Sequence, residues 1–225
     1  MLHIIMGGTF DPVHNGHLRV AVELREQLGA AVVHLMPSNV PPHRQQPGAS
    51  PDQRLHMLRL AVANEPGLQV DDRELRLATT SYTAETLRAL RQDLGQQQAV
   101  ALVLGMDAFM GLPDWHEAHS ILRQGHVIVV ERPEHPLDSR SEAGQWLRAH
   151  ETDDIRQLET RPAGYMLLAR PPLLAISATA IRERVAAGRS IRYLLPDAVR
   201  DYIQQQGLYR QGATESPLAD TVPDQ

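Results

Sequence analysis

The sequence predicts an α/β fold: a Rossmann-like, doubly wound and mostly parallel sheet with helices on both faces. Short apolar runs alternate along the chain with segments of helical periodicity. The run at 99–105 (AVALVLG) is apolar almost throughout, as in a strand that is buried on both faces of a parallel sheet. The run at 3–6 leads into Gly7 and Gly8 and then into a helical pattern, which is how an α/β unit begins.

The individual elements follow from the same patterns. Apolar runs predict strands at 3–6, 31–36, 99–105, 126–132 and 165–169. Helical spacing, with glycines or capping residues at the ends, predicts a first helix through Leu18, Val22 and Leu28 that ends at Gly29, and further helices at 82–94, 139–150, 179–187 and 197–206. The proline-rich stretch 37–50 predicts a loop.

Two more helices are expected from the residues at their starts. Ser50 has the features of an N-cap, with Pro51 at the first helical position and Gln53 closing a capping box. The apolar face of this helix is predicted to consist of Leu55, Leu58 and Val62. The run DWHE at 114–117 predicts a second capped start.

The composition narrows the class of protein. The 225 residues are expected to form one domain over 1–210, followed by an aperiodic and disordered tail over 211–225. The absence of cysteine excludes a disulfide scaffold and thiolate chemistry. No apolar run is long enough to span a membrane and no signal peptide is visible, so we expect a cytoplasmic protein without a membrane partner. The net charge of −5 disfavours a nucleic-acid partner.

The chain also lacks lysine, since all 22 basic residues are arginines. This excludes Schiff-base chemistry and a P-loop that depends on its lysine. Any phosphate must then be held by arginine, histidine, hydroxyls and backbone N–H groups.

The segment 7–17 (GGTFDPVHNGH) is the first candidate site. Glycines after a strand allow a ligand to approach the backbone, and the following helix N-terminus offers N–H groups to an anion. His14 and His17 are three residues apart, which places both imidazoles on one helix face as a possible phosphate clamp. The alternative is a glycine turn with two structural histidines. Two histidines are too few for a zinc site, and the dinucleotide fingerprint GxGxxG is absent.

The segment 176–182 (ISATAIR) is the second candidate site. Ser177 and Thr179 place hydroxyls at a predicted helix start, and Arg182 follows one turn later. Together they can bind a second anion, although ordinary helix capping with a solvated arginine is the alternative. Two such elements in one small α/β domain suit a triphosphate.

The two segments resemble the (H/T)xGH and ISSTxIR motifs of the nucleotidyltransferase superfamily, in the same order. Ala178 stands where that family often has serine. Further segments resemble the bacterial nicotinate-nucleotide adenylyltransferase family, and the resemblance covers about residues 3–209: PSNVPPHR at 37–44, SYT at 81–83, ETL at 85–87, GMD at 105–107, LPDW at 112–115, RSIRY at 189–193, Pro196, Tyr202, Ile203 and GLY at 207–209. Arg44 replaces a lysine that is common in the family, which keeps the charge but changes its geometry.

The resemblance implies transfer of AMP from ATP to nicotinate mononucleotide, giving deamido-NAD and pyrophosphate. On this basis ATP is expected to contact Gly7, Gly8, Thr9, Phe10, His14, His17, Ser177, Thr179 and Arg182, of which His14, His17 and Arg182 are the candidate catalytic residues. Magnesium is expected to arrive with ATP, without a protein metal site, because the motifs contain no dedicated carboxylate cage.

Nicotinate mononucleotide is expected to contact Ser81, Tyr82, Thr83, Gly105, Asp107 and Trp115, with weaker expectations for Asn39, Arg44 and Arg132. Trp115, as the residue after an N-cap, would provide a stacking platform, and the N–H groups of the helix start at 81–84 would bind the carboxylate. Trp115 could instead be a core residue, Asp107 a helix cap, and each arginine a solvated side chain.

Two other readings stay open. A sister transferase would use nicotinamide mononucleotide, pantetheine phosphate or another phosphate acceptor. A non-catalytic nucleotide-binding module would share the fold but is expected to have damaged motifs. The sequence leaves the oligomeric state undecided.

Overall fold

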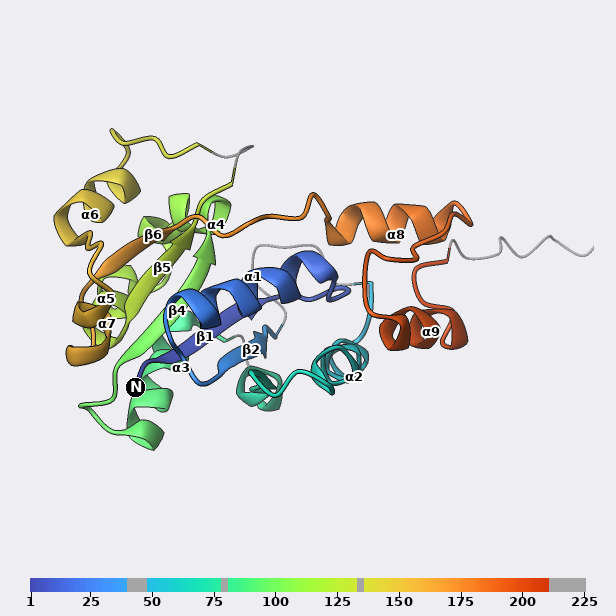
Figure 1. The fold of residues 1–225 in the computed structure, drawn as a ribbon, viewed down its shortest axis with the longest axis horizontal. Coiled ribbons are helices and arrows are strands. Elements are labelled where there is room, and N and C mark those ends of the chain that lie inside the picture. Colours follow the sequence, from blue (N-terminus) through green and yellow to red (C-terminus); the bar gives the residue numbers. More distant parts are fainter. Residues whose placement is uncertain (40–47, 78–80, 133–135, 211–225) are drawn as a thin grey trace, which may run out of the picture.

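The protein is described by a computed structural model, which covers residues 1–39, 48–77, 81–132 and 136–210. Within them, six parallel strands form one sheet with the order β3-β2-β1-β4-β5-β6 (Figure 1). The strands are β1 (His3–Gly8), β2 (Val33–Pro37), β3 (Leu68–Val70), β4 (Val100–Gly105), β5 (His126–Val130) and β6 (Met166–Ala169). The predicted fold class is confirmed, and the sheet is parallel in all of its described pairings.

The strand order changes direction between β1 and β4. From β1 the chain adds β2 and then β3 on one side of β1, and β4 then pairs with the other side of β1. In open parallel sheets such a switch point leaves a crevice outside the carboxyl ends of the two central strands, where ligands bind. Gly8 ends β1 and Gly105 ends β4, so both candidate glycines lie at this edge.

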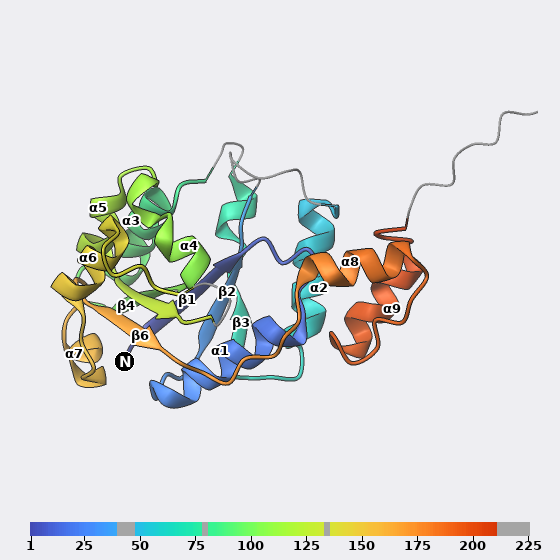
Figure 2. The same ribbon diagram turned by 90° about the horizontal axis from the view of Figure 1, so that it is seen from above.

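Helices cover both faces of the sheet. Successive strand side chains point to opposite faces, so alternate strand residues belong to separate cores. Ile4 belongs to a core with residues from α1 (Asn15–Gln27), α2 (Pro51–Val62) and α7 (Ile155–Thr160). Ile5 belongs to a second core, built with residues of α3 (Thr83–Leu94), α4 (Met106–Met110), α5 (Ala118–Gln124) and α6 (Glu142–His150). Figure 2 shows α1 and the group α3–α6 on opposite sides of the strands.

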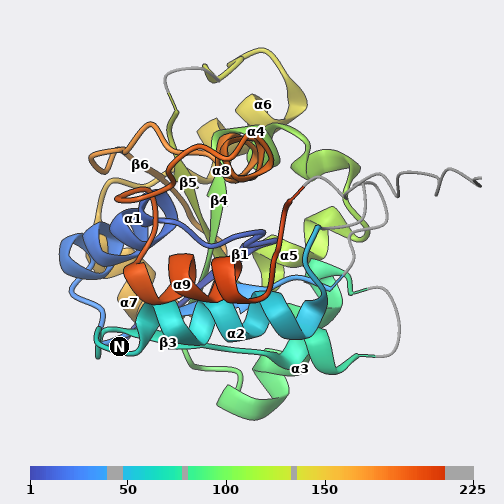
Figure 3. The same ribbon diagram turned by 90° about the vertical axis from the view of Figure 1, so that its right-hand side faces the viewer.

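The two C-terminal helices form a separate group at one end of the sheet. They are α8 (Ala178–Ala186) and α9 (Asp197–Gln205), and both contribute buried residues to the first core. Figure 3 shows α9 lying along α2. The rings of Tyr202 and His56 are 4.5 Å apart across this contact. The C-terminal segment is thereby held beside the carboxyl end of β1.

The predicted start of α2 is confirmed. The Gln53 N–H donates to the Ser50 hydroxyl at 3.2 Å, and the Ser50 N–H donates to the Gln53 side chain at 2.8 Å. The predicted apolar face is only partly correct, because the helix buries Leu58 together with Met57 and Arg54. Leu55 and Val62 are half-buried.

The predicted helix start at 114–117 is wrong. Residues Leu112–Asp114 form a short 3-10 turn, η2, and the Trp115 N–H donates back to the Leu112 carbonyl at 3.0 Å. Trp115 itself is extended, and α5 begins only after Glu117, whose φ is 49°. The polar run resembles a helix cap, but the hydrogen bond of the preceding turn uses the Trp115 N–H, and the chain continues extended at Trp115. Trp115 therefore does not follow an N-cap.

Sequence periodicity also missed several short elements. These are β3, α4, α7 and the 3-10 turn η1 (Arg73–Arg76). Elements of three to six residues are too short to display a period of 3.6 or 2 above chance. Most of the predicted loop 37–50, including Arg44, and the predicted tail 211–225 lie outside the described residues. In the described part of the chain, no helix has the length and apolarity needed to cross a membrane.

Candidate active site

The two motif histidines stand at the junction of β1 and α1. His14 is the N-cap residue of α1 and His17 is in its first turn. Their rings are stacked, with centroids 3.7 Å apart and planes inclined by 25°. The three-residue spacing thus places both imidazoles together beside the helix N-terminus, where backbone N–H groups and the helix dipole favour an anion.

One hydrogen bond determines the tautomer of His17. The backbone N–H of His14 donates to Nδ1 of His17 at 3.3 Å. A neutral His17 must therefore carry its proton on Nε2, which makes this atom a hydrogen-bond donor. Burial and, to a smaller extent, the charge of Arg132 lower the pKa of His14 to about 4. Burial, His14 and then Arg132 lower the pKa of His17 well below its usual value. Both rings are neutral N–H donors near pH 7.

The glycines of the motif keep this junction compact. A Cβ on Gly16 would lie 2.9 Å from Nδ1 of His14, and a Cβ on Gly8 would lie 3.1 Å from the ring of Phe10. That ring meets His17 edge-on, with centroids 5.1 Å apart. Gly7 is exposed, and its missing side chain would face open space. A ligand can therefore approach the backbone at Gly7.

The C-terminal motif meets the first motif directly. Arg182 donates through Nη1 to the carbonyl of Asp11 at 2.7 Å and through Nη2 to the Thr179 hydroxyl at 3.2 Å. Ser177 caps α8, since its hydroxyl accepts the Ala180 N–H at 3.1 Å. The capping alternative is therefore correct for Ser177, while Arg182 is turned toward the first motif and held there.

Residues that sequence reasoning missed support this junction from behind. Arg54 is fully buried and donates to the carbonyls of Thr9 and Ser38 at 2.8 and 2.9 Å. Asp11 is buried beside it, and its charge partly offsets the effect of burial on the pKa of Arg54. The sequence contains one signal for this role: Arg54 lies one helical turn before Leu58, on the face of the helix predicted to be apolar, which indicates a buried arginine.

The carboxyl end of β4 carries a second group of candidate residues. Asp107 lies in the first turn of α4, and Nη1 of Arg132 is 3.8 Å from its carboxylate. A Cβ on Gly105 would be 2.8 Å from the Asp107 carboxylate and 3.3 Å from the Arg132 guanidinium. Gly105 thus leaves space for this exposed pair. The charge of Arg132 also lowers the pKa of both motif histidines.

The segments around Tyr82 and Trp115 also come together. Tyr82 is the N-cap residue of α3, and its ring centroid is 4.4 Å from that of His116. Trp115 is half-buried and packs against the second core, as its structural alternative expects. The two segments thus lie close together, although Trp115 is only partly available to a ligand.

Two of the residues expected to contact nicotinate mononucleotide, Ser81 and Asn39, already form hydrogen bonds within the protein. The hydroxyl of Ser81 donates to Glu74 at 2.9 Å, and Thr86 donates to the same carboxylate at 2.8 Å. Burial raises the pKa of Glu74. Asn39 donates to the carbonyl of Leu77 at 3.1 Å. At this helix start, backbone N–H groups are therefore better placed to bind a ligand than the Ser81 hydroxyl.

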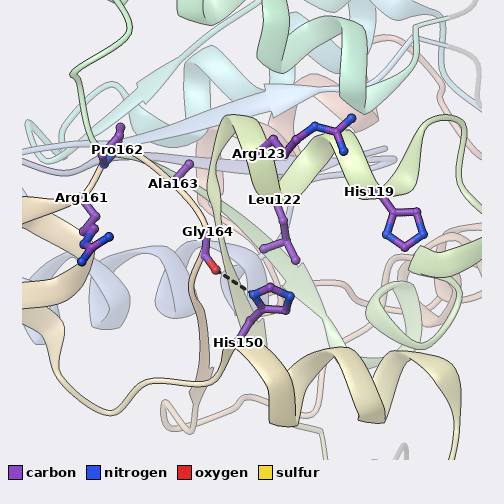
Figure 4. Close-up of a pocket in the computed structure, with 8 residues that line it drawn as sticks. All are labelled: His119, Leu122, Arg123, His150, Arg161, Pro162, Ala163 and Gly164. Atoms are coloured by element: carbon purple, nitrogen blue, oxygen red, sulfur yellow. Dashed lines mark hydrogen bonds between the residues drawn. The ribbon is translucent and has the colours of Figure 1, made fainter.

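Outside this site, the described part of the chain contains a surface depression but no cluster of metal ligands. Among the described residues, no three histidines, aspartates or glutamates come together as metal ligands. A surface depression of about 620 Å³ is lined by His119, Leu122, Arg123, His150, Arg161, Pro162, Ala163 and Gly164, none of which belongs to the motifs. Figure 4 shows its two arginines pointing apart and the 3.2 Å contact from His150 to the Gly164 carbonyl.

The fold and the two motifs that meet at Asp11 are those of a nucleotidyltransferase of the α/β class. The family model described as "Cytidylyltransferase-like" matches residues 5–184. A Salmonella typhimurium protein named "Nicotinate-nucleotide adenylyltransferase" is 47% identical over 213 residues, which is 93% of this chain and 99% of that protein. A Klebsiella pneumoniae protein named "Probable nicotinate-nucleotide adenylyltransferase" is 48% identical over 209 residues, 92% and 97% of the two chains.

Within that larger family, the chain belongs to the nicotinate-nucleotide adenylyltransferase family. Solved structures agree on the fold. The Plasmodium falciparum nicotinic acid mononucleotide adenylyltransferase complexed with NaAD has a TM-score of 0.71 at 17% identity, with 92% of this chain and 97% of that chain covered. The same enzyme complexed with APC has a TM-score of 0.67, with coverage of 92% and 96%.

Proposed function

We propose that the chain transfers AMP from ATP to nicotinate mononucleotide and releases deamido-NAD and pyrophosphate. The observation that carries this proposal is the meeting of the two motifs. His14 and His17 are neutral N–H donors at the start of α1, and Arg182 donates to the Asp11 carbonyl in the loop that leads to them. Donors from two distant segments therefore converge where the strand order switches.

The reaction needs charge stabilisation more than proton removal. The nucleophile is a phosphate monoester, which is largely dianionic near pH 7 because its second pKa is about 6. One of its oxygens forms a bond to the α-phosphorus of ATP, and the bond from that phosphorus to the bridging oxygen breaks with its electron pair leaving on pyrophosphate. Catalysis then depends on positioning and on donors aimed at the phosphoryl oxygens.

The ATP roles follow from this geometry. We assign Nε2–H of His17 to the α-phosphoryl oxygens, with His14 beside it. Arg182, Thr179 and the start of α8 at Ser177 would bind the leaving phosphates. The backbone over 7–10 would separate the two nucleotides. Magnesium would enter bound to the phosphates of ATP, and we assign no protein side chain to it.

The acceptor would occupy the carboxyl end of β4. We assign Gly105 and Asp107 to its ribose phosphate side, with Arg132 nearby, and Trp115 to the pyridine ring. The carboxylate would bind N–H groups at the start of α3, at Tyr82 and Thr83 near Ser81. Asn39 and Arg44 remain weaker assignments. We further propose that residues 1–210 act as one domain in the cytoplasm.

Pyrophosphate release with ATP and each acceptor in turn tests this function. The acceptors are nicotinate mononucleotide, nicotinamide mononucleotide and pantetheine phosphate. N–H groups match a carboxylate but meet the N–H groups of an amide, and such polar mismatch can reach ~10⁴-fold in rejection. We expect at least a hundredfold preference, on the order of 3 kcal/mol, for the acid in kcat/KM. Equal use of the two pyridine nucleotides would favour the sister transferase, and no release at all would favour a binding module.

A further inference from the structure

The buried carboxylate of Asp11 joins three separate parts of the chain. It accepts the N–H of Gly48 at 2.8 Å, the N–H of Ala49 at 3.1 Å and the hydroxyl of Tyr209 at 2.7 Å. Gly48 and Ala49 lie just before α2, and Tyr209 follows α9. Asp11 itself is in the loop between β1 and α1. One carboxylate therefore holds the phosphate-binding loop against the C-terminal segment.

The same residue also positions Arg182. The Asp11 carbonyl accepts a hydrogen bond from Nη1 of Arg182 at 2.7 Å, and the carboxylate is 3.9 Å from the same nitrogen. A shift of the Asp11 backbone or side chain therefore moves the guanidinium. Arg54 fixes Thr9, two residues before Asp11, by a hydrogen bond to its carbonyl. The negative charge of Asp11 attracts the guanidinium of Arg182, and hydrogen bonds from neutral donors stabilise the buried carboxylate.

Tyr209 is well suited to fix Asp11. Burial raises the pKa of its hydroxyl, and the hydrogen bond to Asp11 raises it further, so the hydroxyl remains a donor. Its ring packs close to Gly48, where an added Cβ would lie 3.1 Å from the ring carbons. The backbone of Tyr209 has a φ of 61°, which is costly for a non-glycine residue and indicates that surrounding contacts hold it.

We propose that Tyr209 is a positioning residue, acting through Asp11, for the group that binds the leaving phosphates of ATP. This inference rests on the proposed function, because it takes Arg182 to contact ATP. Tyr209 does not touch the reacting atoms. Its hydroxyl holds the Asp11 carboxylate, and Asp11 holds Arg182. The C-terminal segment thereby belongs to the ATP side of the site. The acceptor side does not depend on Tyr209.

The test is Tyr209→Phe, which removes the hydroxyl and keeps the ring. We expect KM for ATP to rise by up to about fivefold, the limit reached if the whole net contribution of one hydrogen bond, about 1 kcal/mol, is lost from ATP binding, while KM for nicotinate mononucleotide stays within twofold. Tyr202→Phe is the matched control. It lies on α9, and within the described part of the chain its hydroxyl makes no hydrogen bond. We expect this control to keep both KM values.

A second variant and a binding measurement complete the test. Asp11→Asn removes the charge beside Arg182 and should raise KM for ATP more than Tyr209→Phe does, with urea unfolding reporting whether the variant is folded. Calorimetric titration with pyrophosphate should show weaker binding to Tyr209→Phe than to wild type, whatever the acceptor is. If Tyr209→Phe leaves both KM for ATP and pyrophosphate binding unchanged, or raises both KM values equally, the positioning role is wrong. Failure of wild type to release pyrophosphate would instead refute the proposed function.

Discussion

The two halves of the candidate site differ in how firmly they are built. On the ATP side His14 is 5% exposed and Arg54 is fully buried, and hydrogen bonds connect Asp11 to the Gly48 N–H, Tyr209 and Arg182. On the acceptor side the side chains of Asp107 and Arg132 are 40% and 45% exposed and share one contact of 3.8 Å. The Asp11 junction of the ATP side is preorganised, whereas the Asp107–Arg132 pair on the acceptor side is solvated.

This difference has a chemical reason. Charge develops on the phosphoryl oxygens during transfer, and donors that are already in place stabilise it without reorganisation at that moment. The acceptor needs only to be bound and oriented. Solvated side chains can rearrange around it, at the cost of ordering them when it binds. Changes on the ATP side should therefore reduce turnover strongly, whereas changes on the acceptor side should chiefly weaken acceptor use.

The largest expected effect follows from His17→Ala. Removing its Nε2–H takes away a donor aimed at developing charge, so kcat should fall by at least a hundredfold, about 3 kcal/mol, with a smaller change in KM for ATP. Steady-state pyrophosphate release measures both parameters. His119→Ala, at an exposed histidine in the remote depression, is the control and should keep full activity. A His17 variant that retained more than about a tenth of kcat, a loss below ~1.4 kcal/mol, would contradict the assignment.

Arg182→Ala should follow, with a fall of about fiftyfold in kcat/KM for ATP. A hydrogen bond to a charged partner contributes about 1.5–3 kcal/mol, and the arginine also anchors the junction at Asp11. Higher magnesium should offset part of the loss by screening the same phosphates. Arg184→Ala on the same helix is the control, because its guanidinium donates to the Ser190 carbonyl. An increase in KM for nicotinate mononucleotide with unchanged ATP kinetics would place Arg182 on the wrong substrate.

Stability should depend on pH through the buried histidine of the ATP side. The pKa of His14 is about 4 in the folded protein against 6.5 for an ordinary histidine, so only the unfolded chain takes up this proton between pH 7 and 5. The free energy of unfolding should then fall by about 2 kcal/mol over that range from His14 alone. Urea unfolding at both pH values tests this. His14→Gln should show a smaller fall than wild type, and His119→Gln the same fall; an unchanged slope in His14→Gln would refute the effect.

Among the residues assigned to contact a substrate, the smallest effect is expected on the acceptor side. Trp115→Ala should lower kcat/KM by up to about tenfold for both nicotinate and nicotinamide mononucleotide, since stacking contributes about 0.5–1.5 kcal/mol and the face of the ring hardly distinguishes acid from amide. The ratio between the two acceptors should therefore stay close to that of wild type. Because Trp115 also packs against the second core, unfolding of the variant must be measured in parallel. A collapse of the ratio would show that Trp115 orients the carboxylate.

Local patterns predicted most of the fold and the central motifs. The strands β1, β2, β4, β5 and β6 and the capping box of α2 were all visible as runs, spacings and cap residues. The stacking of His14 and His17 follows from a spacing of three residues at a helix start. These features depend on neighbours within a few residues, so their physical cause is contained in the sequence around them.

Other features depended on parts of the chain that meet only after folding. Residues 114–117 resemble a capped helix start, but the turn over Leu112–Asp114 leaves Trp115 extended and α5 begins later. Asp11 is joined to Tyr209 and Arg182, residues from far along the chain, and no local pattern marks any of these pairings. The motifs themselves could be identified from the residues in order. The contact between the motifs depends on the packing of α2, α8 and α9 at one end of the sheet, and so does the burial of Arg54 and Asp11. These residues are far apart in the sequence, so only the folded core brings them together.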